Sequence, residues 1–179
     1  MARMSRRRWP VQAPGQKALW LDDFLPYRAG VAAGEIARVL DPHYQRYGLS
    51  LPEIAVLSVL AEETAVTQQS IVMRSVMEKF TISRAARALL ERGLVERSEH
   101  ATDGRSHLLS LTSAGRRLYA RIVPLSLRFE ERLMHALGGP KELERMKREL
   151  LRLQRAAKSV AGERTWNRRR SGPKTRTSA

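Results

Sequence analysis

The sequence predicts a mainly α-helical fold with one small β-hairpin, and three observations lead to that fold class. Apolar residues recur at helical spacing through most of residues 21–153. Over residues 94–111 the period shortens to the alternation that is typical of strands. Of the 179 residues, 42% are hydrophobic and 28% are charged, which is enough apolar material for a core. The chain has no cysteine, so disulfide scaffolds, thiolate metal sites and thiol redox switches are excluded.

The first helix is predicted between Leu21 and Tyr47, where apolar residues recur near helical spacing. Pro26 and Pro42 fit first-turn or kink positions, because proline lacks the N–H that an interior helical residue donates. Gly48 is expected to end this helix.

Three further helices are predicted before the change of period. Ser50 and Glu53 match a capping box, in which the two residues satisfy backbone groups at the start of a helix. Thr67 is a suitable N-cap for a short helix over residues 68–76. A fourth helix is expected over residues 79–92, because a glycine follows it directly.

A β-hairpin with a long, polar tip is predicted next, from residues 94–97 and 106–111. A helix over residues 113–137 follows, and Pro124 is expected to bend it. A last helix carries an apolar stripe at heptad-like spacing over residues 143–153.

This order of elements predicts one domain over residues 18–162, with a winged helix-turn-helix at about 50–115. It is flanked by helices at about 20–47 and 113–160. The flanking helices carry more apolar surface than one small subunit can bury, so we expect them to be dimerisation helices of a homodimer. An intramolecular helical bundle is the alternative.

The net charge of +15 divides into three parts. Residues 1–17 carry five basic residues and no acidic one, and residues 163–179 carry six basic residues and one acidic one. Both segments are predicted to be disordered tails, either solubilising remnants or arms that bind phosphate without sequence preference. Residues 74–121 hold ten basic and five acidic residues, which is the whole excess of the remaining chain. This balance favours a polyanionic partner.

The cellular location is predicted from two absences in the sequence. The N-terminal arginines are not followed by the apolar region of an export signal. No run approaches the roughly 18 apolar residues of a transmembrane helix. We therefore expect a cytoplasmic protein with no membrane partner.

The helix over residues 79–92 has one face suited to double-stranded DNA. With Ile82 turned to the core, an outer face carries two arginines, and two hydroxyls flank it near the helix start. Arginine can bind guanine O6 and N7 through two hydrogen bonds, and helix N-terminal amides favour phosphate. The candidate DNA-binding residues of this helix are Lys79, Phe80, Thr81, Ser83, Arg84 and Arg87. A solvated arginine face without a partner is the alternative.

The hairpin favours the DNA-binding interpretation. Arg105, at its tip, is long enough to enter a minor groove beside the recognition helix. Asp103 is expected to orient Arg105, because a bare carboxylate would repel DNA.

These residues resemble the MarR family of winged helix-turn-helix bacterial transcription regulators. The pattern Asp103-x-Arg105, followed by Leu-x-Leu-Thr-x-x-Gly over residues 109–115, is fairly specific to that family. The resemblance covers about residues 20–155. It implies a homodimer that binds a pseudo-palindromic operator, usually as a repressor. It also implies that a small aromatic or phenolic effector can release the DNA, as in many relatives.

Three departures from the family pattern affect function. Phe80 stands where a small polar residue is commoner, so a contact with a thymine methyl or packing on the wing are its two alternatives. Gly104 stands where many members have a second basic residue, which predicts a weaker minor-groove contact. The cysteine-free chain excludes the peroxide sensing of some relatives.

Other functions have less support. The four histidines lie on different predicted elements, and no paired-carboxylate or Gly-rich phosphate motif is present, so we expect no enzyme activity, metal or cofactor. Aromatic residues near the N-terminus line either an effector pocket or the dimer core: Trp20, Phe24, Tyr27, Tyr44 and Tyr47. The runner-up function is a basic architectural or RNA-associated protein that binds through its tails. A third hypothesis is an adaptor for an acidic protein.

Overall fold

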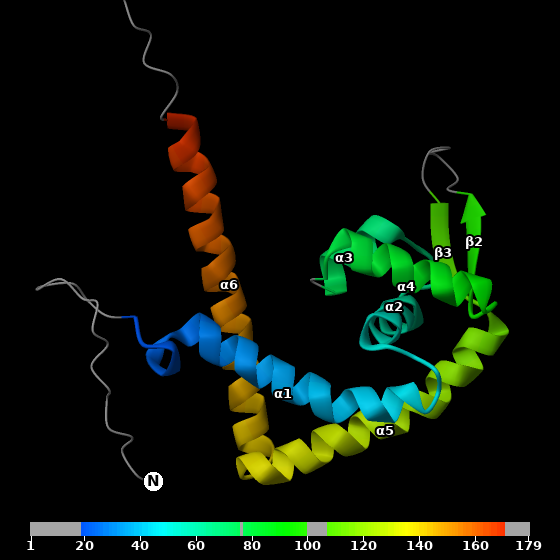
Figure 1. The fold of residues 1–179 in the computed structure, drawn as a ribbon, viewed down its shortest axis with the longest axis horizontal. Coiled ribbons are helices and arrows are strands. Elements are labelled where there is room, and N and C mark those ends of the chain that lie inside the picture. The colour runs from blue at the N-terminus through cyan, green and yellow to red at the C-terminus, as the bar shows by residue number, and fades with distance from the viewer. Residues whose placement is uncertain (1–18, 76, 100–106, 171–179) are drawn as a thin grey trace, which may run out of the picture. The chain divides into compact units, whose positions relative to one another are not determined.

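The computed structural model describes residues 19–75, 77–99 and 107–170, and Figure 1 shows their elements in chain order. The chain divides into two compact units, residues 1–120 and 121–179, which are described separately. The elements are a 3-10 turn (Leu21–Asp23), α1 (Leu25–Gln45), α2 (Leu51–Glu62), β1 (Val66–Thr67), α3 (Gln68–Ser75), α4 (Lys79–Glu91), β2 (Val95–Glu99), β3 (His107–Leu111), α5 (Ser113–Leu137) and α6 (Pro140–Arg170). The predicted fold class and order of helices and hairpin are confirmed.

Local capping sets the helix boundaries of the first unit. The first helix was predicted from Leu21 to Tyr47, but residues 21–23 form a separate 3-10 turn and α1 runs from Leu25 to Gln45. Pro26 lies in the first turn of α1, and Gly48 adopts a positive φ of 65° after the helix ends. The capping box of α2 is present, since the backbone N–H and the hydroxyl of Ser50 donate to the Glu53 carboxylate at 2.8 and 2.7 Å. Thr67 accepts a hydrogen bond from the N–H of Ser70 at 3.2 Å, as expected of an N-cap.

The hairpin belongs to a three-stranded antiparallel sheet with the order β1-β3-β2. Leu109 on β3 lies opposite Val66 on one side and Arg97 on the other. Leu109 and Leu111 are both buried, as the alternation predicts. The additional strand β1 was not predicted, because two residues are too few to show a period.

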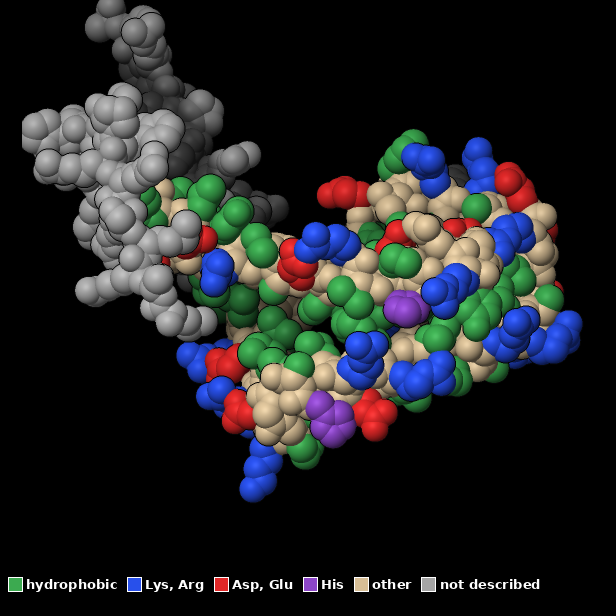
Figure 2. Space-filling model, turned by 60° about the horizontal axis from the view of Figure 1, so that its bottom comes forward, with side chains coloured by type: hydrophobic (Ala, Val, Ile, Leu, Met, Phe, Trp, Pro, Cys, Tyr) green, Lys and Arg blue, Asp and Glu red, His purple; other side chains and the backbone are tan. Residues whose placement is uncertain are grey.

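The core of the described chain lies in the helix-turn-helix and the sheet. All buried hydrophobic residues fall between Tyr44 and Ile122, and Ile71, Ile82 and Leu89 are 0% exposed. Hydrophobic side chains on α1 and α6 are instead largely exposed. Figure 2 shows hydrophobic side chains on the surface, between charged ones. The flanking helices therefore have apolar surface that these residues of the chain do not cover.

A close backbone approach joins the start of α5 to the loop before β2. The hydroxyl of Thr112 donates to Gly93 O at 2.8 Å and accepts from the N–H of Gly115 at 3.0 Å. A Cβ built on Gly115 would lie 2.0 Å from Leu94 O. The Thr-x-x-Gly pattern is therefore explained by packing, because a larger residue than glycine does not fit at its last position.

The second unit contains the later part of α5 and α6. Ile122 is its one buried residue among those whose side chains are described. Lys147 on α6 pairs with Glu130 on α5 at 2.8 Å and with Glu144 at 3.3 Å. Hydrogen bonds to these carboxylates, first of all to Glu130, raise the pKa of Lys147.

The C-terminal tail was predicted to start at residue 163, but α6 continues to Arg170. Low apolar content argued for disorder there. A helix that is already nucleated extends at one hydrogen bond per residue, and residues 163–170 contain neither glycine nor proline. Residues 1–17, the remaining C-terminal residues and the expected core residue Val76 lie outside the described chain. None of the described helices is both long and apolar enough to span a membrane.

Candidate DNA-binding surface

Helix α4 has the two faces that its sequence predicts. Its inner face packs into the core, where Ile82, Ala85, Ala86 and Leu89 are all buried. On the opposite side, Phe80, Arg84, Arg87 and Glu91 are exposed. Thr81 and Ser83 are partly buried, and Lys79 is exposed at the first position of the helix. The buried inner face of α4 therefore fixes the helix in the domain, and with it the positions of its six candidate residues.

Phe80 and Arg84 form a pair on the outer face. The guanidinium carbon of Arg84 lies 5.8 Å from the centroid of the Phe80 ring, which is within the range of a cation–π contact. Phe80 itself is 72% exposed. Packing of the ring on the wing, one of its two predicted roles, stays a prediction, because residues 100–106 lie outside the described part of the chain.

A groove of about 570 Å³ lies along this surface. One wall is the start of α2, with Ser50 and Pro52, and the other wall is the outer side of α4, including Thr81, Arg84 and Arg87. The groove is open rather than enclosed, and its α4 wall combines the hydroxyl of Thr81 with two guanidinium groups and, farther along the helix, the carboxylate of Glu91. Hydroxyl and guanidinium groups donate hydrogen bonds to phosphates and base edges.

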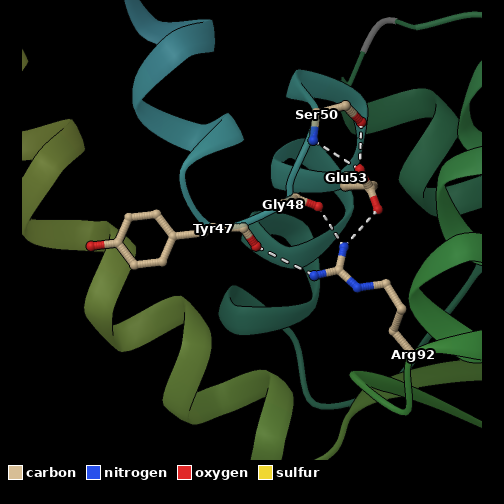
Figure 3. A network of polar contacts seen from close by, with 5 residues as sticks. All are labelled: Tyr47, Gly48, Ser50, Glu53 and Arg92. Carbon is tan, nitrogen blue, oxygen red and sulfur yellow. Dashed lines mark hydrogen bonds and ion pairs between the residues drawn. The ribbon is translucent and has the colours of Figure 1, made fainter.

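The end of α4 is fixed to the corner between α1 and α2 by Arg92 (Figure 3). Its Nη1 donates to Gly48 O at 2.7 Å and to Glu53 Oε1 at 3.2 Å, and its Nη2 donates to Tyr47 O at 3.4 Å. Glu53 is 9% exposed and accepts from Ser50 through its other oxygen. One carboxylate thus caps α2 and holds the arginine that follows α4.

Sequence reasoning recognised Glu53 as a capping residue and did not connect it to Arg92. The two residues are 39 positions apart, so no local pattern joins them. The one local signal for a second partner was the type of residue. A carboxylate has two acceptor oxygens, and a capping box does not use all of their hydrogen-bonding capacity.

Arg74 is likewise used inside the fold. It forms ion pairs with Glu62 and Glu63 at the end of α2. Hydrogen bonds to Glu63 and then to Glu62 raise the pKa of the Arg74 guanidinium. Arg74 and Arg92 therefore account for two of the basic residues in the charged stretch. The outer face of α4 retains Lys79, Arg84 and Arg87 as exposed cations.

The wing residues Asp103 and Arg105 lie outside the described residues, as does Gly104. The two strands below them are in place, and β2 pairs with β3 from Val95↔Leu111 to Glu99↔His107. Within the described part of the chain, no group of three His, Asp or Glu side chains is placed to hold a metal ion.

Comparison with known proteins identifies this arrangement. The model of the MarR family matches residues 49–107, which include α2 to α4 and the start of β3. The transcriptional regulator HosA of Escherichia coli O111:H- is 26% identical over 94 residues, which are 52% of this chain and 70% of HosA.

Solved structures agree with the match. A MarR family transcriptional regulator from Silicibacter pomeroyi has a TM-score of 0.66 and 27% identity, and the match covers 84% of this chain and 97% of that one. The regulator MosR of M. tuberculosis, solved in complex with DNA, shares the fold with a TM-score of 0.66 at 23% identity. That match covers 77% of this chain and 98% of MosR. We conclude that residues 49–107 match the MarR family and that the described chain is similar throughout to winged helix-turn-helix transcription regulators of that family, a family of DNA-binding proteins and not of enzymes.

Proposed function

We propose that this regulator is a repressor that binds a pseudo-palindromic operator as a homodimer, with α4 in the major groove. The observation that carries the proposal is the outer face of α4. It presents Arg84 and Arg87 to solvent, while the inner face of the same helix is buried. Rigid support matters because a base contact requires a side chain to be held at a fixed depth in the groove.

Each candidate residue has a role in this proposal. Arg84, and with it Arg87, contacts base edges, because guanidinium groups can bind guanine through two hydrogen bonds. Lys79, Thr81 and Ser83 lie in the first turns of α4, where they and the helix amides bind phosphate. By resemblance to the family, Arg105 enters the minor groove and Asp103 orients it.

The homodimer is supported by apolar surface on both flanking helices. On α1, Leu25, Ile36 and Val39 share one side of the helix and are 58%, 40% and 49% exposed. On α6, Met146 and Leu150 are 43% and 55% exposed. A second copy of the chain would remove these side chains from water, as is usual for the more apolar interfaces of homodimers.

The proposal includes release of the DNA by a small aromatic effector. Its support is a set of aromatic side chains along α1 and just before it, of which Trp20, Phe24 and Tyr27 are exposed and Tyr44 is buried. The test is displacement of the protein from its operator by a panel of phenols and benzoic acids. If none of these compounds changed operator binding, release by an aromatic effector would be rejected and the proposed operator binding would stand.

The test of DNA recognition starts with selection of operators from a random duplex library. We expect two inverted half-sites about one helical turn, roughly 10 bp, apart. In a titration on the selected duplex, Arg84→Ala should lose about 1–3 kcal/mol of binding free energy. Arg46→Ala is the matched control, since Arg46 is an exposed arginine at the end of α1. Equal affinity of the Arg84→Ala and wild-type proteins would reject the role of Arg84.

Two further variants separate the alternatives. Arg105→Ala should weaken operator binding without loss of folding stability, and an unfolded variant would show that the Asp103–Arg105 pair is structural. A chain without residues 1–17 and 163–179 should keep most of its sequence preference. Loss of all binding in that truncated chain would instead favour the architectural function through the tails. A reporter gene behind the operator should be expressed more strongly when the regulator is deleted.

A further inference from the structure

Phe80 is a large apolar side chain in a place where the fold does not need it. It is 72% exposed, the highest value of any aromatic residue in the described chain. Its backbone lies at the second position of α4, and the core of that helix is supplied by other residues. A single exposed apolar side chain is common on protein surfaces. This one lies beside the exposed Arg84 on the outer face of the candidate recognition helix, where bound DNA would cover it.

The neighbour of Phe80 narrows the chemistry of that partner. Arg84 follows four positions later, about one turn or 6 Å along the helix, and its guanidinium lies 5.8 Å from the ring centroid. A guanidinium that stacks on a ring keeps its N–H donors free in its own plane. Phe80 can therefore hold Arg84 in place while Arg84 donates hydrogen bonds.

The spacing of the two groups suits neighbouring base pairs. Consecutive bases on a strand are about 3.4 Å apart, so group centres 5.8 Å apart lie between one and two base steps. The edges of the ring and of the guanidinium extend beyond their centres, so both can reach neighbouring pairs. In the major groove, arginine favours guanine O6 and N7, and an apolar side chain favours the C5-methyl of thymine.

We propose that Phe80 and Arg84 act as one unit that recognises two adjacent base pairs, with Phe80 on a pyrimidine 5-methyl group and Arg84 on a guanine. Thymine is the source of the methyl in unmodified DNA. The inference rests on the proposed function, because it requires α4 to enter the major groove. Beyond the proposed function, it specifies the pair of adjacent bases that each half-site must contain and the side chain that contacts each of them.

The experiment measures the methyl group alone. The full chain is first used to select duplexes from a random library, and each half-site is expected to contain a T·A pair beside a G·C pair. The thymine is then replaced by deoxyuridine, which removes the methyl and keeps the base pair. We expect the wild-type affinity to fall about three- to fivefold, the effect of one buried methyl-sized group. Phe80→Ala should bind both duplexes equally.

A second pair of duplexes tests the source of the methyl. Replacing the T·A pair by C·G should weaken wild-type binding, and 5-methylcytosine at that cytosine should recover about three- to fivefold. Phe80→Ala should not distinguish the two cytosines. Phe80→Leu should keep part of the methyl effect, because it remains apolar, but should lower the preference for guanine, because it offers Arg84 no ring.

Met73→Ala is the matched control, since Met73 is 73% exposed on α3 and equally apolar. It should show the wild-type ratio between thymine and deoxyuridine. Selected sites that lack thymine beside guanine would overturn the inference, and so would a deoxyuridine effect of equal size in wild type and Phe80→Ala. Both outcomes leave operator binding intact. Absence of any selected sequence would reject the proposed function itself, so the two failures are distinguishable.

Discussion

At the residue scale, Gly115 is the position where the backbone leaves least room. A Cβ there would lie 2.0 Å from Leu94 O, so Gly115→Ala must displace either the start of α5 or the loop before β2. We expect a loss of about 1–3 kcal/mol in the free energy of unfolding, measured by urea denaturation at fixed protein concentration.

Gly34→Ala is the matched control for that substitution. Gly34 lies inside α1, and a Cβ on it meets nothing within 4 Å. We expect this variant to gain about 0.5–1 kcal/mol, because alanine favours helix more than glycine does. If Gly115→Ala were as stable as wild type, the close approach to Leu94 would not constrain the sequence.

The sequence indicates that Gly115 belongs to a motif and does not indicate why. Its neighbour Leu94 is 21 positions away, and the contact depends on the register of the hairpin between them. By contrast, the outer face of α4 follows from helical periodicity alone. Once one residue of a helix is assigned to the core, the 3.6-residue period fixes the side on which every other residue lies. The predicted positions of Phe80, Arg84 and Arg87 are confirmed for that reason.

At the scale of elements, the attachment of α4 to the corner between α1 and α2 can be tested at Arg92. Arg92→Met removes three hydrogen bonds, and it leaves the buried Glu53 carboxylate with Ser50 alone. The Arg92 side chain is 37% exposed, so water replaces part of what is lost. We expect the free energy of unfolding, measured by urea denaturation, to decrease by about 1–2 kcal/mol.

Arg46→Met is the control for Arg92→Met. Arg46 is exposed at the same corner, and its substitution should change stability by less than about 0.5 kcal/mol. Equal stability of the two variants would show that α4 is held by its apolar face alone. Operator affinity should then be compared between Arg92→Met and wild type at a temperature where both are folded.

The elements themselves differ in how far sequence predicts them. Helix α2 begins at its predicted capping box, and α4 begins and ends within one residue of its predicted limits, because a cap or a glycine marks these boundaries. Strand β1 has two residues and no period of its own, and it is a strand only because β3 pairs with it. The C-terminal tail was predicted to start at residue 163, before the end of α6 at Arg170. Low apolar content indicates that a segment is not buried, but it does not indicate where a helix ends.

At the scale of the whole molecule, the distribution of the core predicts self-association. The winged helix-turn-helix buries its own apolar residues, whereas the described part of the second unit buries Ile122 alone. Two helices with exposed leucines are marginal in water without a partner. Folding of this region and assembly of the chain are therefore expected to be one process, with a midpoint of thermal unfolding that rises with protein concentration.

This coupling can be tested by sedimentation equilibrium. The wild-type chain should have a mass of about 41 kDa, twice the 20.3 kDa of one chain. Leu150→Glu places a charge on the exposed apolar side of α6, so self-association should weaken about tenfold or more. Lys141→Glu, an exposed charged position at the start of the same helix, should leave the mass unchanged. If Leu150→Glu also sedimented as a dimer at micromolar concentration, this side of α6 would not be the interface. The interface would then lie on another part of the chain. Only a wild-type mass of one chain, 20.3 kDa, would mean that a single monomer binds a half-site, and the selected sequences would then lack inverted symmetry.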